Sequence, residues 1–192
     1  MQQYLKLLAG EIMETQPRTE TPFPNIPPIL ESDDREYRDP GVPSTVAIAG
    51  HPLHPLSVIF PIAFLAAALV TDAVYWLTRD SFWARGSFWL IVAGLATGVV
   101  AALIGMSDFL QIGRVRKRTA GWAHMILNVT LLVLTAINLF LRWNNPVGAI
   151  LPWGLILSTI VGTLTSISGW YGAELSYRHK IGVVGPGSRT QP

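Results

Sequence analysis

Six side chains that can bind a metal ion lie at or near the ends of long apolar runs: His51, His54, Asp108, His124, Glu174 and His179. Imidazole and carboxylate groups are ligands of iron, zinc and manganese, and two imidazoles are what the iron of a b-type haem needs. No cysteine is present, which excludes thiolate metal sites, iron–sulfur ligation, disulfides and cysteine nucleophiles. The candidate haem ligands are therefore His51, His54 and His124, and all six side chains are candidates for a metal ion without porphyrin.

The histidines also have structural interpretations that involve no ligand. His51 and His54 fit a helix start at a membrane surface, and His179 lies between two basic residues, where a solvated side chain or a lipid headgroup contact is favoured. His124 differs because it lies within an apolar run, and an ionisable side chain inside a membrane is a functional candidate by default. We therefore expect His124 to act as a ligand or a proton carrier.

The elements that must position these residues are membrane-spanning helices. Of the 192 residues, 50% are hydrophobic and 14% are charged, and the mean hydropathy of +0.39 is too high for an ordinary soluble domain. Four runs of roughly 20 or more residues carry at most one or two charges each, which is the length a helix needs to cross a bilayer. The sequence thus predicts an all-α, multi-pass membrane four-helix bundle, with helices at about 52–78, 86–110, 119–142 and 150–173.

Three prolines shape the first predicted helix. Pro52 and Pro55 are tolerated in the first turn, because the N–H groups there have no intrahelical acceptor, so they mark the helix start. Pro61 lies about two turns further on, where it should free the carbonyl of Ser57 and kink the helix. A kink at this depth opens space next to the histidines.

Two further features concern the packing of the helices. Gly94 and Gly98 form a G-x-x-x-G pattern, whose ordinary role is to let two membrane helices approach closely. Asp72 lies in apolar surroundings near the end of the first helix, so we expect it to form a structural ion pair with an arginine. The candidate partners are Arg79, Arg85 and Arg142.

The polar segments set the domain boundaries and the orientation. We expect residues 1–45 to form a mostly disordered, acidic and proline-rich tail, residues 46–183 the transmembrane domain, and residues 184–192 a second disordered tail. The loop at 111–118 contains four basic residues, and all seven tryptophans lie within about two turns of a predicted helix end. The positive-inside rule then places both termini in the cytoplasm.

Antiparallel threading of the four helices brings all four histidines to the cytoplasmic face, together with Asp108 and Glu174. At a rise of 1.5 Å per residue, His124 lies about 7 Å inside the third helix. The carboxylates of Asp108 and Glu174 fit two roles equally well. They cap helices or pair with the basic cluster at 114–118, or they accept a hydrogen bond from the N–H of a ligating imidazole.

These residues belong to motifs that resemble a bacterial membrane family catalogued as domain of unknown function 2231. The motifs are His-Pro-Leu-His-Pro at 51–55 with Phe-Pro at 60–61, Asp108 before the basic loop, Gly-Trp-Ala-His at 121–124, and Gly-Trp-Tyr-Gly at 169–172 followed by Glu174 and Arg-His at 178–179. The resemblance covers about 45–183, with Gly-Ala-Glu at 172–174 departing slightly from the family's Gly-Gly-Glu. It implies a four-helix membrane domain, and we expect this domain in a bacterial cell membrane, with an internal photosynthetic membrane as the alternative. Fusion of some relatives to Rieske-type iron–sulfur modules points to electron transfer.

Our leading hypothesis is a small electron-transfer protein of b-cytochrome type, with haem b bound by His124 and by either His51 or His54. The first alternative is a zinc or iron ion without porphyrin, held by the histidines and by Asp108 or Glu174. The second alternative is a structural or assembly subunit of a larger membrane complex, in which the histidines pair only locally and no cofactor is bound.

Other function classes find no support in the sequence. No G-x-S-x-G, phosphate loop or dinucleotide fingerprint occurs, which argues against hydrolases and nucleotide-binding enzymes. The basic stretch is a short loop at a bilayer surface, which disfavours nucleic-acid binding. We therefore expect the lipid bilayer and a redox partner or membrane complex as the partners, and electron transfer in place of bond-making catalysis.

Overall fold

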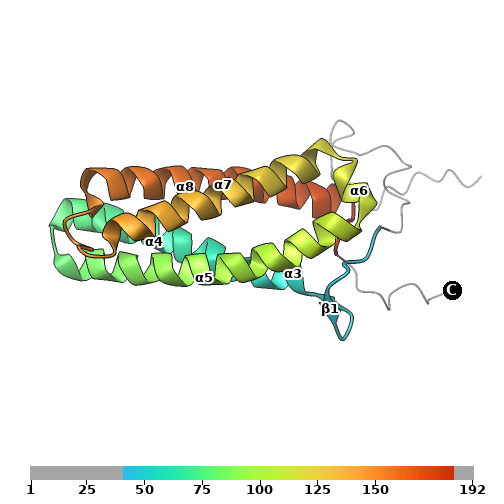
Figure 1. The fold of residues 1–192 in the computed structure, drawn as a ribbon, viewed down its shortest axis with the longest axis horizontal. Helices are drawn as coiled ribbons and strands as arrows, with labels where there is room; N and C mark the ends of the chain where they lie inside the picture. Colours follow the sequence, from blue (N-terminus) through green and yellow to red (C-terminus); the bar gives the residue numbers. More distant parts are fainter. Residues whose placement is uncertain (1–40, 184–192) are drawn as a thin grey trace, which may run out of the picture. The chain divides into compact units, whose positions relative to one another are not determined.

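The computed structural model describes residues 41–183, and its main elements are four long helices. All four are long and apolar enough to cross a membrane, and their course can be followed in Figure 1. The spans consist of α3 (Leu53–Ser57) continued by α4 (Ile59–Thr78), α5 (Ser81–Gln111), α7 (Thr119–Arg142), and α8 (Leu155–Ala173). The predicted all-α, four-span architecture is therefore confirmed.

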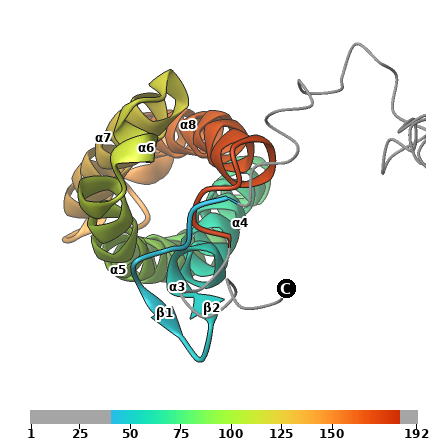
Figure 2. The same ribbon diagram turned by 90° about the vertical axis from the view of Figure 1, so that its right-hand side faces the viewer.

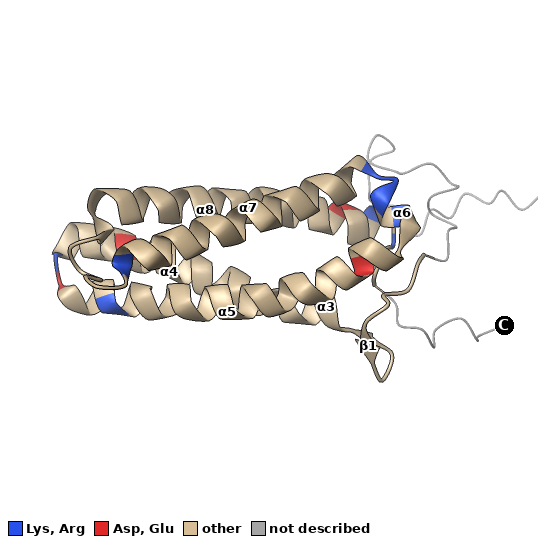
Figure 3. Cartoon of the chain, viewed as in Figure 1, with Lys and Arg blue, Asp and Glu red and all other residues tan. Residues whose placement is uncertain are grey.

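Short elements connect and extend the spans. A two-stranded antiparallel hairpin, β1 (Ala47–Ile48) and β2 (His51–Pro52), precedes α3, with Ile48 opposite His51. The helix α6 (Gly113–Arg116) connects α5 to α7 and carries part of the basic loop, as Figure 3 shows. The fourth span is preceded by η2 (Ile150–Gly154), where the chain is kinked at the non-helical residue Leu151, and it ends with a wider helical turn, η3 (Glu174–Arg178).

The four spans are arranged as a ring in which each helix contacts two neighbours. Helix α4 packs against α5, α5 against α7, α7 against α8, and α8 against α4, as seen from the α6 end in Figure 2. The first span therefore lies diagonally across from α7, and α5 lies diagonally across from α8. Large apolar side chains such as Phe140, which is 80% exposed, cover the outside of the bundle, where lipid would surround them.

The first span is interrupted at Val58, which separates α3 from α4. Proline at position 61 has no N–H to offer the carbonyl of Ser57, so the regular bonding pattern is lost one turn before the proline. The chain nevertheless keeps helical geometry, because Val58 N–H donates to His54 O and Ile62 N–H donates to Val58 O. The break thus falls directly after the turn that carries His54.

The second span starts at Ser81, five residues before the predicted start. Asp80 is the reason, because its carboxylate accepts a hydrogen bond from Phe82 N–H at 2.9 Å and so caps the first turn of α5. Arg79 ends α4 in a left-handed conformation with φ of 58°. The connection between the first two spans is therefore only two residues long, and the expected loop at 79–85 is mostly helical.

Gly94 and Gly98 pack closely against neighbouring helices, as the G-x-x-x-G pattern predicted. A Cβ atom added at Gly94 would lie 2.7 Å from Leu65 Cδ2 on α4, and one added at Gly98 would lie 2.9 Å from Leu132 Cδ2 on α7. Both distances are shorter than ordinary van der Waals contact. Helix α5 thus approaches two neighbours closely through these glycines.

A buried ion pair ties the four spans together near the end opposite α6, and it confirms the expected partnership of Asp72 with an arginine. Arg142 binds Asp72 through both terminal nitrogens, at 2.7 and 2.6 Å, and both side chains are fully buried. The remaining guanidinium N–H groups donate to Ser87, Ser158 and Asn138. All five donors are satisfied by groups on α4, α5, α7 and α8, which is the condition under which a buried charge is tolerated.

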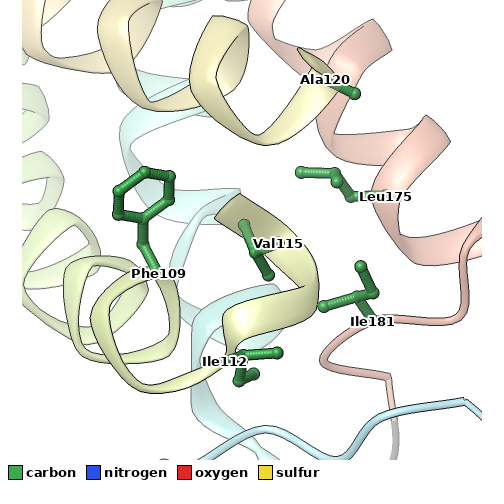
Figure 4. Packing of buried hydrophobic residues seen from close by; sticks show 6 residues of the cluster. All are labelled: Phe109, Ile112, Val115, Ala120, Leu175 and Ile181. Atoms are coloured by element: carbon green, nitrogen blue, oxygen red, sulfur yellow. The ribbon is translucent and has the colours of Figure 1, made fainter. Parts of the chain in front are cut away.

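Apolar side chains close the bundle at the α6 end. Figure 4 shows this cluster, which joins α5, α6, α7, η3 and the segment after it. Its members are Phe109, Ile112, Val115, Ala120, Leu175 and Ile181. A second cluster of Leu65, Leu131 and Val161 fills the middle of the bundle. Between these two clusters lie the histidines of the candidate site.

Candidate cofactor site

His54 and His124 face each other inside the bundle. Their ring centroids are 6.2 Å apart, and the two ring planes make an angle of 84°. His54 comes from α3 and His124 from the first turns of α7, so the rings approach from spans that lie diagonally across the bundle. The structure therefore brings His124 together with His54, one of the two partners that the sequence allowed.

Each ring is held through Nδ1 by a backbone carbonyl of a neighbouring helix. His54 Nδ1 lies 3.0 Å from Ala101 O on α5, and His124 Nδ1 lies 2.9 Å from Ser168 O on α8. A carbonyl oxygen can only accept, so the network assigns the proton of each neutral ring to Nδ1. The lone pair of each ring then resides on Nε2, the nitrogen that could bind a metal.

Two glycines give the rings access to these carbonyls. In a helix, the side chain of residue i+4 leans towards the helix N-terminus and covers the turn that holds the carbonyl of residue i. The residues four positions after Ala101 and Ser168 are Gly105 and Gly172. A Cβ atom at Gly105 would lie 2.5 Å from His54 Cε1, and one at Gly172 would lie 3.0 Å from His124 Cε1.

The same arrangement therefore occurs twice, once in each helical hairpin. We call residues 53–111 the first helical hairpin and residues 119–178 the second helical hairpin. Asp72 follows His54 by eighteen residues, and Arg142 follows His124 by the same eighteen residues, which is five turns of an α-helix. Each hairpin thus contributes one histidine to the site near α6 and one charge to the ion pair at the opposite end.

A cavity of about 410 Å³ contains the two rings, a volume within the range of cofactor and small-molecule sites. It reaches from the closed α6 end towards the middle of the bundle, between residues of all four spans. Small residues of α5 and α8 line the cavity across the second diagonal: Gly98, Ala101, Ala102, Gly105, Gly169 and Gly172. The cavity is therefore bordered by small side chains on both helices of this diagonal.

Asn128 and Ser168 form a further part of the site that the sequence had not indicated as functional. Asn128 Nδ2 donates to His124 O and to Ser168 Oγ, both at 2.7 Å. Ser168 Oγ in turn lies 3.1 Å from His124 Nδ1. One turn separates Asn128 from His124, and that spacing was the signal that could have identified the amide as a neighbour of the ring.

Asp108 lines the same cavity but directs its carboxylate to the segment that precedes the β-hairpin. Its oxygens accept hydrogen bonds from Ser44 Oγ at 2.8 and 3.1 Å, from Thr45 N–H at 2.6 Å and from Thr45 Oγ1 at 2.7 Å. Val42 is also fixed, because its N–H donates to Lys180 O. Residues 42–45 are thus held on the bundle, although the sequence had assigned them to the tail; the rest of that tail, residues 1–40, lies outside the described residues, as does 184–192.

The other predicted ligands lie apart from the His54–His124 pair. His51 is exposed in β2, with Nδ1 2.9 Å from Ala49 O. His179 is buried beyond η3, and its Nε2 lies 3.8 Å from Glu174 Oε1. Within residues 41–183, no three or more of the His, Asp and Glu side chains come close enough together to hold a metal ion. The six-residue set thus separates into the paired rings, the Asp108 anchor, the Glu174–His179 contact and the isolated His51.

Four helices long and apolar enough to cross a membrane define a multi-pass membrane protein whose candidate site is the facing pair of imidazoles. The chain belongs to the family described as predicted membrane protein (DUF2231), which matches residues 50–185 and so confirms the resemblance seen in the motifs. Neither the curated proteins nor the solved structures include a match to the chain.

Proposed function

We propose that the protein transfers electrons in the membrane through a haem b held between His54 and His124. The observation that carries this proposal is the separation of the two rings. Two imidazoles on opposite sides of one metal, each with a metal–nitrogen distance of about 2 Å, have ring centres roughly 6 Å apart. The ring centroids of His54 and His124 lie 6.2 Å apart.

The donor set favours haem over a metal ion without porphyrin. A bare zinc ion in a structural site takes about four ligands from the protein, and even catalytic sites take three. Haem needs only two axial ligands, because the porphyrin supplies the other four. Two imidazoles with Nε2 unprotonated, and no third ligand beside them among residues 41–183, therefore suit an iron porphyrin better than zinc.

The lining of the cavity supports the same choice. The histidines come from α3 and α7 on one diagonal of the bundle, and the small residues come from α5 and α8 on the other. The residues of α5 and α8 that would border a tetrapyrrole held by the two histidines therefore include several small ones. A bound haem would supply a one-electron couple, and the chain would bind it, orient it and exclude water from it.

This centre would lie close to the cytoplasmic membrane surface. His124 is five residues from the start of α7, a depth of about 8 Å along the helix. The basic residues of α6 and its surroundings are at the same end, and basic loops favour the cytoplasmic side. A redox partner that approaches from this side would meet the centre through a thin layer of protein.

The decisive experiment is a reduced-minus-oxidised absorption spectrum of the full chain, purified in detergent from cells supplied with a haem precursor. We expect a Soret band and an α band typical of six-coordinate b-type haem, and about one haem per chain. Elemental analysis of the same sample separates iron in haem from zinc or iron without porphyrin. A folded, monodisperse protein that contains no haem after reconstitution would overturn the proposal and leave the structural or assembly role.

A further inference from the structure

We infer that Asn128 and Ser168 are positioning residues that make His124 a stronger electron donor than His54. The inference rests on the proposed function for its redox consequence, whereas the hydrogen bonds that carry it concern the protein alone. Ser168 is 3% exposed and lies on α8, directly across from His124 on α7. Its hydroxyl group and its carbonyl group both lie within hydrogen-bond distance of His124 Nδ1.

The hydroxyl group of Ser168 makes different hydrogen bonds from the hydroxyl groups of its neighbours on the same helix. Thr165 Oγ1 donates to Val161 O, and Ser166 Oγ donates to Gly162 O, which is the usual bond of a helical hydroxyl to the preceding turn. Ser168 Oγ instead reaches α7, where it accepts from Asn128 Nδ2 at 2.7 Å. An oxygen that accepts from the amide is held in place as a second acceptor for the Nδ1 proton of His124.

The first helical hairpin lacks both of these groups. The residue that corresponds to Ser168 is Ala101, which offers His54 a carbonyl group and no hydroxyl. The residue one turn after His54, in the place that Asn128 takes after His124, is Val58. The two imidazoles are therefore presented in matching ways to the cavity, but among residues 41–183 a second acceptor lies behind the ring of His124 and not behind that of His54.

Hydrogen bonding at Nδ1 raises the basicity of a ligating imidazole. A more basic axial ligand stabilises the oxidised iron more than the reduced iron, so it lowers the reduction potential. The second acceptor at His124 should hence lower the midpoint potential of the centre. It should also restrict rotation of the ring, because two acceptors on α8 fix the direction of the Nδ1–H bond.

The test compares three variants of the full chain. Ser168→Ala removes the hydroxyl, Ala101→Ser places one behind His54, and Ser166→Ala is the matched control on the same helix, two residues from Ser168 and exposed. We expect a positive shift of the midpoint potential for Ser168→Ala, a negative shift for Ala101→Ser and no shift for Ser166→Ala, at equal haem content. Equal potentials for wild type and Ser168→Ala, or equal shifts for Ser168→Ala and Ser166→Ala, would overturn the inference.

A second measurement needs no haem. In protein labelled with nitrogen-15 at histidine, the Nδ1 proton of His124 should move upfield in Ser168→Ala and Asn128→Ala, because its hydrogen bond weakens, and stay in place in Ser166→Ala. If the wild type binds no haem, the proposed function fails, and this spectrum alone decides the inference. An unchanged Nδ1 resonance in both variants, with the fold intact by circular dichroism, would refute the positioning role.

Discussion

Gly105 leaves open the space that the His54 ring occupies, since a Cβ atom at this position would lie 2.5 Å from Cε1 of the ring. The missing side chain exposes the carbonyl of Ala101, and His54 takes that carbonyl as its acceptor at 3.0 Å. A residue without a side chain therefore determines where a ligand candidate points. The geometry of the site depends on such backbone contacts as much as on the histidines themselves.

Replacing Gly105 with alanine should displace the His54 ring and weaken haem binding. Loss of an outer contact that orients a ligand typically lowers affinity by about 10–100-fold, and the new methyl group also fills part of the cavity. The control is Gly86→Ala on the same helix, where no atom lies within 4 Å of the added Cβ. Haem titration of the two purified variants gives the comparison, and equal affinity would show that the ring tolerates the methyl group.

Substitution of either facing histidine should abolish the six-coordinate spectrum. We expect His54→Ala and His124→Ala to lose most of the bound haem or to become five-coordinate, because each removes one axial ligand. His51→Ala is the matched control, since His51 lies only three residues from His54 but is exposed and binds Ala49 O. Retention of the wild-type spectrum by His54→Ala, or its loss in His51→Ala, would show that the ligands are assigned incorrectly.

Arg142→Met should destabilise the bundle by about 3–5 kcal/mol, because it leaves the carboxylate of Asp72 buried without its partner. The double variant Asp72→Leu with Arg142→Met removes both charges and should recover most of this loss. Arg85→Met, at an exposed arginine of the same membrane end, should change little. Thermal unfolding in detergent measures all three, and a double variant no more stable than Arg142→Met would contradict the account.

Asp108→Ala should release residues 44–46 from the bundle while leaving the four spans in place. Each hydrogen bond to a charged carboxylate contributes about 1.5–3 kcal/mol, and Asp108 accepts bonds from both Ser44 and Thr45. Amide exchange in this segment should accelerate by at least tenfold. Asp80→Ala removes a helix-capping carboxylate at the opposite end and should leave the exchange of 44–46 unchanged.

The membrane fold could be predicted from the sequence because it depends on composition over long windows. Twenty apolar residues in a row have few alternatives to a spanning helix, and every helix of this kind was found close to its expected bounds. The partner of Asp72 was also among the three candidates, because a buried carboxylate demands a cation and few were within reach. Both arguments use properties that are visible in residue types alone.

The finer geometry of the site depends on contacts that residue types do not reveal. His51 and His54 are each followed by proline and lie three residues apart, so only the position of the helix start distinguishes the exposed ring from the buried one. The acceptors of His54 and His124 are backbone carbonyls, which every residue possesses. The sequence does contain a glycine four positions after each acceptor residue, but the role of that glycine can be recognised only when the positions of the helices are known.

The contact of Asp108 with Ser44 and Thr45 could not be predicted from the sequence for a different reason. The segment before residue 46 resembles a disordered tail in composition, and the bonds to Asp108 span more than sixty positions of sequence. Val42 packs against the apolar cluster at the α6 end, and one buried carboxylate binds the hydroxyl and amide groups of the two small residues that follow. Average polarity does not reveal a single anchoring contact of this kind.

The equal spacing from His54 to Asp72 and from His124 to Arg142 also bears on how the chain avoids wrong pairings. Two first hairpins from neighbouring molecules, packed in the manner of the native bundle, would confront one carboxylate with another in an apolar interior. Two second hairpins would likewise oppose two guanidinium groups. Unlike charges at matching positions thus make each half of the chain fit the other half and reject its own copy, so a bundle of two unlike hairpins is selected over a bundle of two like hairpins.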